Sequence, residues 1–460
     1  MNTFLSIIQM INHYLSDYVL VILLAGSGLF FTMRTRFVQV RCLGMGIKKA
    51  FGEIRPAGHR RKSGISSFQA LSTAIAAQVG TGNIVGASGA ILTGGPGALF
   101  WMWIIAFFGM ATIYAEAVLS QETRKIATDG TVYGGPVYYI RKAFKGKTGS
   151  FMANFFAVGA VLALGFMGAM VQSNSISCAI NSAFGIHPRA IGIILAIVSG
   201  VILSGGIKRI SAVTEKMVPL MAFLYILGGI IVIVCRISYI PETFEMIFGY
   251  AFKPQAIIGG SFGMALKTAV SQGVKRGLFS NEAGMGSTPH AHAVANVEKP
   301  HDQGVAAMVG VFIDTFVVLT ITGLIIISTL YAGNGPLSAN AVRGAADGIT
   351  KNNMVQLAIG GVLGNIGFGN AFVAINLLFF SFSSIISWNY FGKINADYLF
   401  GKKFTPFYTL IAVVFTYLGS VASGDIVWEL TDMFNQLMVL PNVIALWALS
   451  KRVSKAAKNN

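Results

Sequence analysis

Charged residues are scarce in this chain of 460 residues: they make up 11% of it, against 54% hydrophobic residues and a mean hydropathy of +0.67. Soluble domains carry about 25% charged residues, because they must cover their surface with groups that water solvates. The composition therefore excludes a cytosolic globular enzyme, a disordered chain and a disulfide-stabilised secreted domain. It predicts an all-α polytopic membrane protein whose surroundings are a lipid bilayer.

Cysteine is scarce too. Of the three cysteines, Cys42 lies among basic residues, whereas Cys178 and Cys235 lie in apolar runs. None belongs to a Cys-x-x-Cys pair, so neither a zinc ribbon nor a redox dithiol is indicated.

Acidic residues number 17 against 34 basic ones, which gives a formal charge of +17. Such an excess indicates nucleic-acid binding when the charges form one face of a soluble domain. Here the basic residues lie in the loops between apolar segments, which is typical of a membrane topology signal. No nucleic-acid partner is expected.

Eleven stretches are apolar enough to cross a bilayer core, which requires about 20 residues per helix. The first is not a cleaved signal peptide, because no Lys or Arg precedes it and Arg34 and Arg36 follow it. The stretches cover roughly residues 18–33, 66–93, 97–120, 150–183, 189–205, 216–236, 256–298, 304–331, 366–391, 405–422 and 425–450.

Lys and Arg are unequally distributed over the loops. With the N-terminus outside, the inside segments carry 26 of the 34 basic residues and the outside segments carry 5, namely Arg189, Arg236, Lys253, Arg343 and Lys351. The positive-inside rule then predicts an outside N-terminus and a cytoplasmic C-terminus. The expected location is a bacterial inner membrane.

The loops are too short for a separate domain, but one of them contains an amphipathic pattern. Ile47, Ala50 and Phe51 alternate with Lys48 and Lys49, which predicts a basic interfacial helix on the inner face.

The middle of the second stretch is polar. It contains Gln78, Gly80, Thr81, Gly82 and Asn83, where a membrane helix ordinarily has Leu and Ile. Two glycines around one residue favour unwinding, which is tolerated at membrane depth only around a cavity or an ion. The alternative is close packing of small residues, which leaves the amides unexplained. A nucleotide-binding loop is weaker still, because the spacing is not Gly-x-Gly-x-x-Gly.

The seventh stretch has the same character. Gly277, Gly284 and Gly286 allow a break, and Pro289 suits the start of a second half-helix. Two interrupted segments about 200 residues apart, each opening five spans, indicate inverted repeats with a substrate site at the bilayer midplane. The predicted organisation is an extra N-terminal helix and basic segment (1–65), two five-helix repeats (66–240 and 241–450) and a tail (451–460).

The residues Gly94-Gly-Pro-Gly-Ala-Leu-Phe-Trp-Met-Trp-Ile-Ile-Ala-Phe-Phe-Gly109 resemble the signature of the alanine/glycine:cation symporters, also called sodium:alanine symporters. The Gly80–Asn83, Met170–Asn174 and Gly277–Gly284 segments are similar to that family as well. The resemblance implies the fold of the bacterial leucine transporter with one extra helix. It also implies uptake of small neutral amino acids with Na⁺, or in some members H⁺, and no enzymatic cofactor.

The same resemblance implies site residues. The amides of Thr81 and Gly82 would face the substrate carboxylate, and the carbonyls of Ala76 and Val79 would help to hold Na⁺, a hard cation that prefers oxygen ligands. The ninth stretch would complete this sodium site with three residues, Phe380, Ser383 and Ser384. For the two serines the alternative is bonding to their own helix backbone.

Two aromatic and two amide side chains are further candidates for the substrate site. Trp388 and Phe279 would leave a pocket that suits alanine or glycine, although packing or lipid contact is the usual role of an isolated aromatic. Gln172 would bind the substrate amine or carboxylate, with interhelix bonding as the alternative. Asn83 would either donate an oxygen to an ion or brace the unwound backbone.

Buried ionisable residues are functional candidates by default. Glu116, Glu282 and Asp314 lie in predicted spans, where salt-bridging or gating is favoured over proton transfer. His290 and His292 form a His-x-His pair, but no further ligand spacing completes a metal site.

The sequence therefore predicts a secondary active symporter for alanine or glycine. A glutamine- or serine-preferring symporter of the same family is the alternative. A channel is disfavoured because no repeated filter-like tract occurs, and an enzyme or an ATP-driven pump is disfavoured because His-Glu-x-x-His and Gly-x-x-x-x-Gly-Lys-[Ser/Thr] do not occur.

Overall fold

The computed structural model describes residues 2–52, 64–128, 130–253, 262–338, 346–422 and 424–458, and these residues are almost entirely helical. Within these ranges the only strands are β1 (Lys125–Ile126) and β2 (Val132–Tyr133), which form a short antiparallel hairpin. The prediction of an all-α protein is confirmed.

The first helical segment is longer than the predicted stretch at 18–33. The π-helical η1 (Leu15–Leu20) joins α1 (Asn2–Tyr14) to α2 (Val21–Arg34) without a break. α3 (Val38–Arg41) then leads into α4 (Leu43–Gly52), the predicted amphipathic helix.

The apolar side of α4 is divided between two environments. Gly46 and Ala50 are buried, and α4 packs against α16, whereas Ile47 and Phe51 are exposed. Four basic residues counted in the same predicted segment lie outside the described residues: Arg55, Arg60, Arg61 and Lys62.

The predicted break in the second stretch is present. α5 (Ser67–Gln78) starts at a capping box made by Ser66 and Gln69, and it ends where Val79 adopts an extended backbone (φ −79°, ψ 94°). The helix resumes as η2 (Gly82–Gly86) and α6 (Ala87–Gly94), bent by 46° from α5.

The next helices carry the stretches predicted for them. The first is α7 (Gly97–Thr123). One continuous helical segment follows, made of α9 (Gly146–Ala160), η3 (Val161–Gly168) and α10 (Ala169–Phe184). The next two are α11 (Pro188–Ser204) and α12 (Gly206–Cys235). α12 starts ten residues before the predicted position 216, and Pro219 lies inside it without ending it. Shorter helices connect these elements, namely α8 (Pro136–Ala143), η4 (Ile237–Tyr239) and α13 (Ile240–Phe252).

The seventh stretch is also broken, between α14 (Phe262–Asn281) and α15 (Pro289–Ala293). Gly284 (φ 87°) and Gly286 (φ 82°) adopt left-handed backbone in the break, which glycine tolerates without strain. Gly277 does not break the helix, contrary to prediction. It lies inside α14, where a Cβ would stand 2.6 Å from the Ile105 side chain, so its role is close packing. Residues 256–261 of this stretch lie outside the described residues.

The last third of the chain is helical in the same way. It consists of α16 (Pro300–Val311), η5 (Phe312–Leu319), α17 (Thr320–Ile326), η6 (Ile327–Tyr331), α18 (Met354–Val362), α19 (Ile366–Phe400), η7 (Lys402–Phe404), α20 (Thr405–Val421), α21 (Gly424–Ala448) and α22 (Ser450–Lys458).

Among the described residues, seven helices are long and apolar enough to cross a membrane, and two bent pairs raise this number to nine. The bent pairs are α5 with η2 and α6, and α21 with α22. α11 is short, with 17 residues, and α14 with α15 is polar. All eleven predicted stretches coincide with helices, but eleven crossings stay a prediction.

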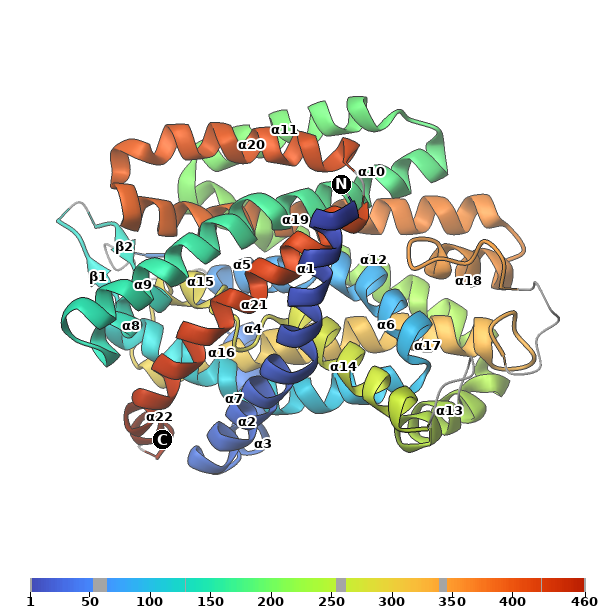
Figure 1. The fold of residues 1–460 in the computed structure, drawn as a ribbon, viewed down its shortest axis with the longest axis horizontal. Coiled ribbons are helices and arrows are strands. Elements are labelled where there is room, and N and C mark those ends of the chain that lie inside the picture. The colour runs from blue at the N-terminus through green and yellow to red at the C-terminus, as the bar shows by residue number, and fades with distance from the viewer. Residues whose placement is uncertain are drawn as a thin grey trace.

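The breaks in both helices are buried, and α5 and α15 lie among the other helices of the bundle (Figure 1). α5 packs against α12, α16 and α19, and every residue from Ala70 to Ser88 is buried. Every residue from Gly277 to Ala295 is buried as well. The helix breaks therefore lie inside the protein rather than facing lipid.

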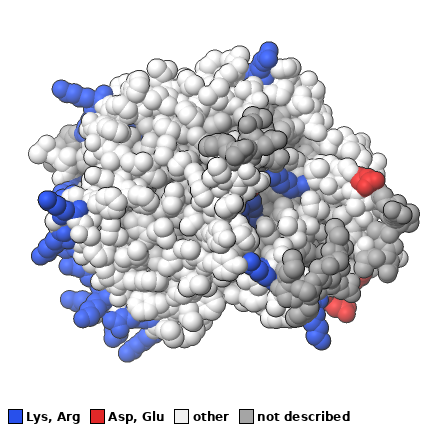
Figure 2. Space-filling model, in the orientation of Figure 1, with Lys and Arg blue, Asp and Glu red and all other residues white. Residues whose placement is uncertain are grey.

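The two ends of the bundle differ in charge. Figure 1 shows α8, the β1–β2 hairpin and α22 at one end and α13 and α18 at the other. On the face drawn in Figure 2, Lys and Arg side chains gather at the α22 end, and the acidic side chains lie near the opposite end.

Candidate substrate and sodium site

The unwound segment after α5 is held by the side chain of Asn83. The Gly80 amide donates to Asn83 Oδ1 across 3.0 Å, and the Asn83 amide donates to the Gly80 carbonyl across 3.2 Å. These are the bonds that the predicted bracing role requires, and the choice between the two roles of Asn83 stays a prediction.

Close packing around this segment explains why residue 80 is a glycine. A Cβ at residue 80 would stand 2.5 Å from Ser384 Oγ and 3.0 Å from Gln172 Nε2. Any larger residue would push α10 and α19 away from the break. The glycine therefore brings three elements together at one point.

The five residues predicted to bind sodium converge here. Ser384 Oγ lies 3.0 Å from the Ala76 carbonyl oxygen, 3.5 Å from that of Val79 and 3.1 Å from that of Phe380. Ser383 Oγ lies 3.2 Å from the Ala76 carbonyl oxygen and 2.8 Å from that of Phe380. The intrahelical bonds considered as the alternative are thus present, together with bonds that cross from α19 to α5.

The chemistry of this cluster fits a monovalent hard cation. It contains three carbonyl oxygens and two hydroxyl oxygens, all buried and without a formal charge. Hard cations such as Na⁺ are bound by oxygen ligands, and an unwound helix supplies carbonyls that no N–H satisfies.

The predicted carboxylate-binding amide has a partner in this conformation. The Thr81 amide donates to Gln172 Oε1 across 3.0 Å, and the Thr81 hydroxyl donates to Ser175 Oγ across 2.7 Å. Gln172 and Ser175 come from α10. A substrate carboxylate at this amide would therefore compete with the Gln172 carboxamide.

Aromatic rings adjoin the two breaks. The Phe279 ring lies edge-on to Trp388, with 5.8 Å between centroids, and 5.0 Å from the centroid of Trp428. A Cβ on Gly82 would stand 3.0 Å from Phe279 Cδ1. The predicted wall of Phe279 and Trp388 is therefore next to Gly82. Trp428, which was not predicted, extends this wall from α21.

A buried carboxylate connects the two broken helices. Asn83 Nδ2 donates to Asp314 Oδ1 across 2.7 Å, and Ser280 Oγ lies 2.9 Å from Asp314 Oδ2. The Thr315 hydroxyl donates to Asp314 Oδ2 across 2.8 Å. Asp314 was predicted only as a buried ionisable residue, and Ser280 was missed although it directly follows Phe279.

A second carboxylate holds the other break. The Gly284 amide donates to Glu116 Oε2 across 3.1 Å, and Asn442 Nδ2 donates to Glu116 Oε1 across 2.6 Å. The Tyr139 hydroxyl donates to Asn442 Oδ1 across 2.5 Å. These donors are neutral, so Glu116 is held by hydrogen bonds rather than by a salt bridge, and gating, the other role favoured for it, stays a prediction. Asn442 gave no sequence signal beyond its place in a span.

A layer of charge covers the site on the α14 side. Lys275 Nζ lies 3.0 Å and Arg276 Nη1 lies 3.2 Å from Asp432 Oδ2. The Arg276 guanidinium also lies over the Trp428 ring, 4.9 Å from its centroid. Between Phe279 and Asp432 is a cavity of about 10 Å³, room for about one water. The described conformation is therefore closed on this side.

Two of the histidines have hydrogen-bond partners of their own. His290 lies 2.9 Å from the Asn395 amide and His292 lies 2.8 Å from the Gln303 amide, so each ring has its own partner. In the part of the chain that the structure describes, no three His, Cys, Asp or Glu residues are placed to hold a metal ion.

Comparison with known proteins identifies the class. The family profile of the sodium:alanine symporter family matches residues 1–460. The chain is 39% identical over 457 residues to the "Sodium/alanine symporter AgcS" of Methanococcus maripaludis, covering 99% of this chain and 97% of that protein. It is 38% identical over 455 residues to the "Probable sodium/glutamine symporter GlnT" of Bacillus subtilis, covering 98% and 90%.

The fold has solved counterparts. The crystal structure of MhsT in complex with L-phenylalanine aligns with a TM-score of 0.60 at 16% identity, covering 87% of this chain and 99% of that one. The leucine-transporter-type fold expected from the resemblance is thereby confirmed, and the protein is a membrane transporter rather than an enzyme. The chain belongs to the sodium:alanine symporter family.

Proposed function

We propose that this symporter couples Na⁺ entry to the uptake of alanine or glycine. The observation that carries the proposal is the convergence of the Ala76, Val79 and Phe380 carbonyls with the Ser383 and Ser384 hydroxyls. Na⁺ would take these five oxygens as ligands. Bound Na⁺ would then fix the end of α5 against α19.

The substrate would bind beside this ion. Its carboxylate would accept hydrogen bonds from the Thr81 and Gly82 amides, after Gln172 releases the Thr81 amide. Gln172 would then be available to the substrate amine or carboxylate. Asn83 would keep the break open through its bonds to Gly80 and Asp314.

The aromatic rings beside the break support a small substrate. Phe279 adjoins Gly82 and contacts both Trp388 and Trp428, and the cavity next to Phe279, of about 10 Å³, has room for about one water. Any amino acid would therefore require these rings to move, and alanine or glycine would require the smallest movement. A glutamine-preferring carrier, as the name of the Bacillus subtilis relative indicates for that protein, would require them to move further. A serine-preferring carrier would require a movement of the rings between these two.

Alternating access would expose this site to each membrane face in turn. Because Lys275 and Arg276 pair with Asp432, opening on that side requires this ion pair to separate.

We further propose an outside N-terminus, a cytoplasmic C-terminus and two five-helix repeats that meet near residue 240, in a bacterial inner membrane. The concentration of basic side chains at the α22 end supports this orientation (Figure 2).

Uptake into liposomes tests the proposal. The purified protein should accumulate labelled alanine under an inward Na⁺ gradient and not when choline replaces Na⁺. A separate H⁺ gradient distinguishes proton coupling, and unlabelled glycine, serine and glutamine rank the substrates by competition. Equal accumulation without any ion gradient would contradict symport.

A further inference from the structure

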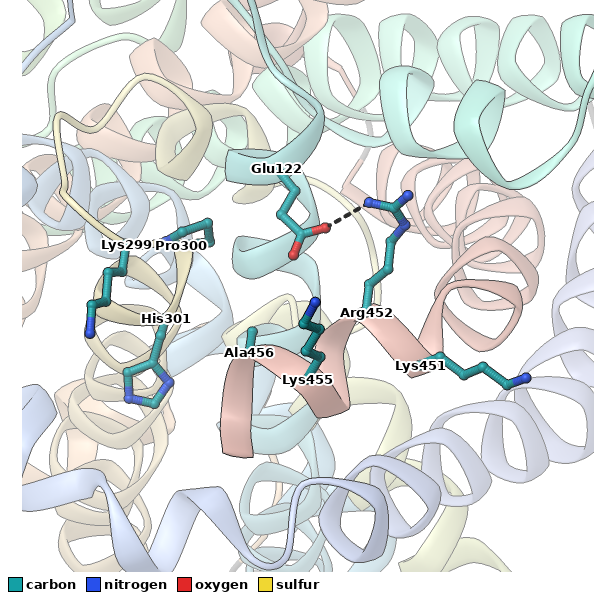
Figure 3. A pocket seen from close by; sticks show the side chains of 8 residues that line it. All are labelled: Glu122, Lys299, Pro300, His301, Lys451, Arg452, Lys455 and Ala456. Atoms are coloured by element: carbon teal, nitrogen blue, oxygen red, sulfur yellow. Dashed lines mark hydrogen bonds and ion pairs between the residues drawn. The ribbon is translucent and has the colours of Figure 1, made fainter. Parts of the chain in front are cut away.

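A cavity of about 800 Å³ lies apart from the residues proposed for substrate and sodium, between the end of α7, the start of α16 and α22 (Figure 3). Pockets of 300–1,000 Å³ are typical of small-ligand sites. Its charged and titratable lining residues are Glu122, Lys299, His301, Lys451, Arg452 and Lys455.

The lining is strongly cationic. Lys and Arg contribute four positive charges and Glu122 contributes one negative charge, which leaves an excess of three. Glu122 lies 3.4 Å from Arg452, so the single carboxylate is already paired with a cation of the lining. An anionic ligand would meet no unpaired negative charge in this lining.

His301 adds a buried donor to the cavity. The side chain is 2% exposed, and its Nδ1 lies 2.8 Å from the Tyr114 hydroxyl. The described residues give His301 Nε2 no hydrogen-bond partner and give the buried Tyr114 hydroxyl no other acceptor. When Tyr114 donates to Nδ1, Nε2 carries the proton and donates, which suits an anionic oxygen.

The geometry of α22 places these cations at the end of a span. α22 is bent by 61° from the preceding part of α21, so it turns away from the span direction. Val453 and Ala457 are buried against the protein, whereas Lys451, Lys455 and Lys458 are exposed. The outward face of α22 is therefore cationic and would lie at the depth of the lipid headgroups.

A second cavity, of about 380 Å³, flanks the other side of α22. It combines cations with apolar side chains, and its lining includes Phe30, Met33, Arg34, Arg36 and Lys458. Inorganic phosphate can pair with the cations but cannot contact the apolar side chains favourably. A phospholipid can contact both kinds of side chain, because its phosphate pairs with cations and its acyl chain covers apolar side chains.

We propose that α22 and the two cavities beside it bind an anionic phospholipid by its phosphate-containing headgroup. Lys299, Lys451, Lys455 and the Nε2 of His301 contact the headgroup oxygens, and Phe30 and Met33 contact the acyl chain. Basic pockets at the cytoplasmic ends of membrane helices are suited to such headgroups. The proposal does not depend on the identity of the transported amino acid.

Thermal unfolding of the full-length protein in detergent tests this site. The probes are dioleoyl phosphatidylglycerol, dioleoyl phosphatidylcholine, inorganic phosphate and glycerol 3-phosphate. We expect phosphatidylglycerol alone to raise the unfolding temperature in a saturable way. In the double variant Lys451→Gln/Lys455→Gln its affinity should fall about 30-fold, because each lysine near an anionic lipid contributes a factor of about five.

The control is Lys142→Gln/Lys145→Gln, which removes the same charge from exposed positions in and just after α8, at the same end of the bundle. It should bind phosphatidylglycerol as the unaltered protein does. An equal response to phosphatidylcholine, an equal loss in the control, or stabilisation by either soluble phosphate would overturn the lipid site. Because all four lysines are exposed, the variants are expected to fold.

Discussion

The Trp388 indole N–H donates a 2.5 Å hydrogen bond to Glu282 Oε1, which joins α19 to the break between α14 and α15. Glu282 has a left-handed backbone (φ 58°), unusual for a residue with a side chain, and the Ser287 hydroxyl donates to its other carboxylate oxygen. The same indole packs against Phe279. A residue proposed to line the substrate pocket therefore also holds the shape of the second broken helix.

The substitution Trp388→Phe separates these two roles, because phenylalanine keeps an aromatic ring and loses the donor. Removing one donor from a buried carboxylate costs about 1–3 kcal/mol. We expect a lower unfolding temperature and a KM for alanine raised roughly tenfold, measured by thermal denaturation and by uptake. Trp447→Phe, on an exposed part of α21, is the control and should change neither. Unchanged uptake in Trp388→Phe would contradict a place for this residue in the pocket.

Ser384→Ala tests the proposed sodium ligands. The substitution removes the hydroxyl that lies within 3.5 Å of the Ala76, Val79 and Phe380 carbonyls. Losing one of five ligands should raise the Na⁺ concentration for half-maximal uptake about tenfold, which corresponds to roughly 1.4 kcal/mol. Ser387→Ala is the matched control, since this buried serine lies on the same helix and its hydroxyl has no partner among the described residues. The same change in both variants would argue against a specific ligand.

Gly80→Ala tests the close approach at the first break. The added methyl group would stand 2.5 Å from Ser384 Oγ, closer than van der Waals contact allows, so α5 and α19 must separate. We expect uptake to be lost while the protein still inserts into the membrane, measured by uptake and by the amount recovered from membranes. Gly89→Ala on α6 has its nearest neighbour at 3.7 Å and should transport normally. Normal uptake by Gly80→Ala would show that the tight contact is not needed.

Asp432→Asn tests the charged layer. The change leaves Lys275 and Arg276 without their carboxylate partner, and breaking such a largely buried pair costs a few kcal/mol. The closed state should lose stability, so bound labelled alanine should dissociate several-fold faster and the unfolding temperature should fall. The exposed Asp347→Asn serves as control. Slower release from Asp432→Asn would contradict a gating role for this ion pair.

The residue types in the two broken helices explain why the breaks could be predicted from the sequence. The helix breaks were predictable because glycine pairs and amides are out of place inside a membrane helix, and Gly284 and Gly286 indeed adopt left-handed backbone. Gly277 was misassigned because a glycine that allows close packing and one that ends a helix look alike in a sequence.

Long-range pairing explains what the sequence did not reveal. Asn442 and Glu116 are 326 residues apart in the chain yet bond directly, and Trp428 reaches Phe279 from a different helix. No local pattern connects such partners, because the packing of helices decides which side chains meet. Ser383 and Ser384 were assigned only because the resemblance to a known family supplied the pairing of α5 with α19.

The most direct test of the account is the affinity of the purified protein for alanine with and without Na⁺, in the unaltered chain and in Ser384→Ala. Linkage requires that the factor by which Na⁺ raises the affinity for alanine is also the factor by which alanine raises the affinity for Na⁺. We predict that Na⁺ lowers the Kd for alanine at least tenfold in the unaltered protein and much less in Ser384→Ala. A Kd that does not depend on Na⁺, or the same Na⁺ effect in both proteins, would contradict the proposed sodium site.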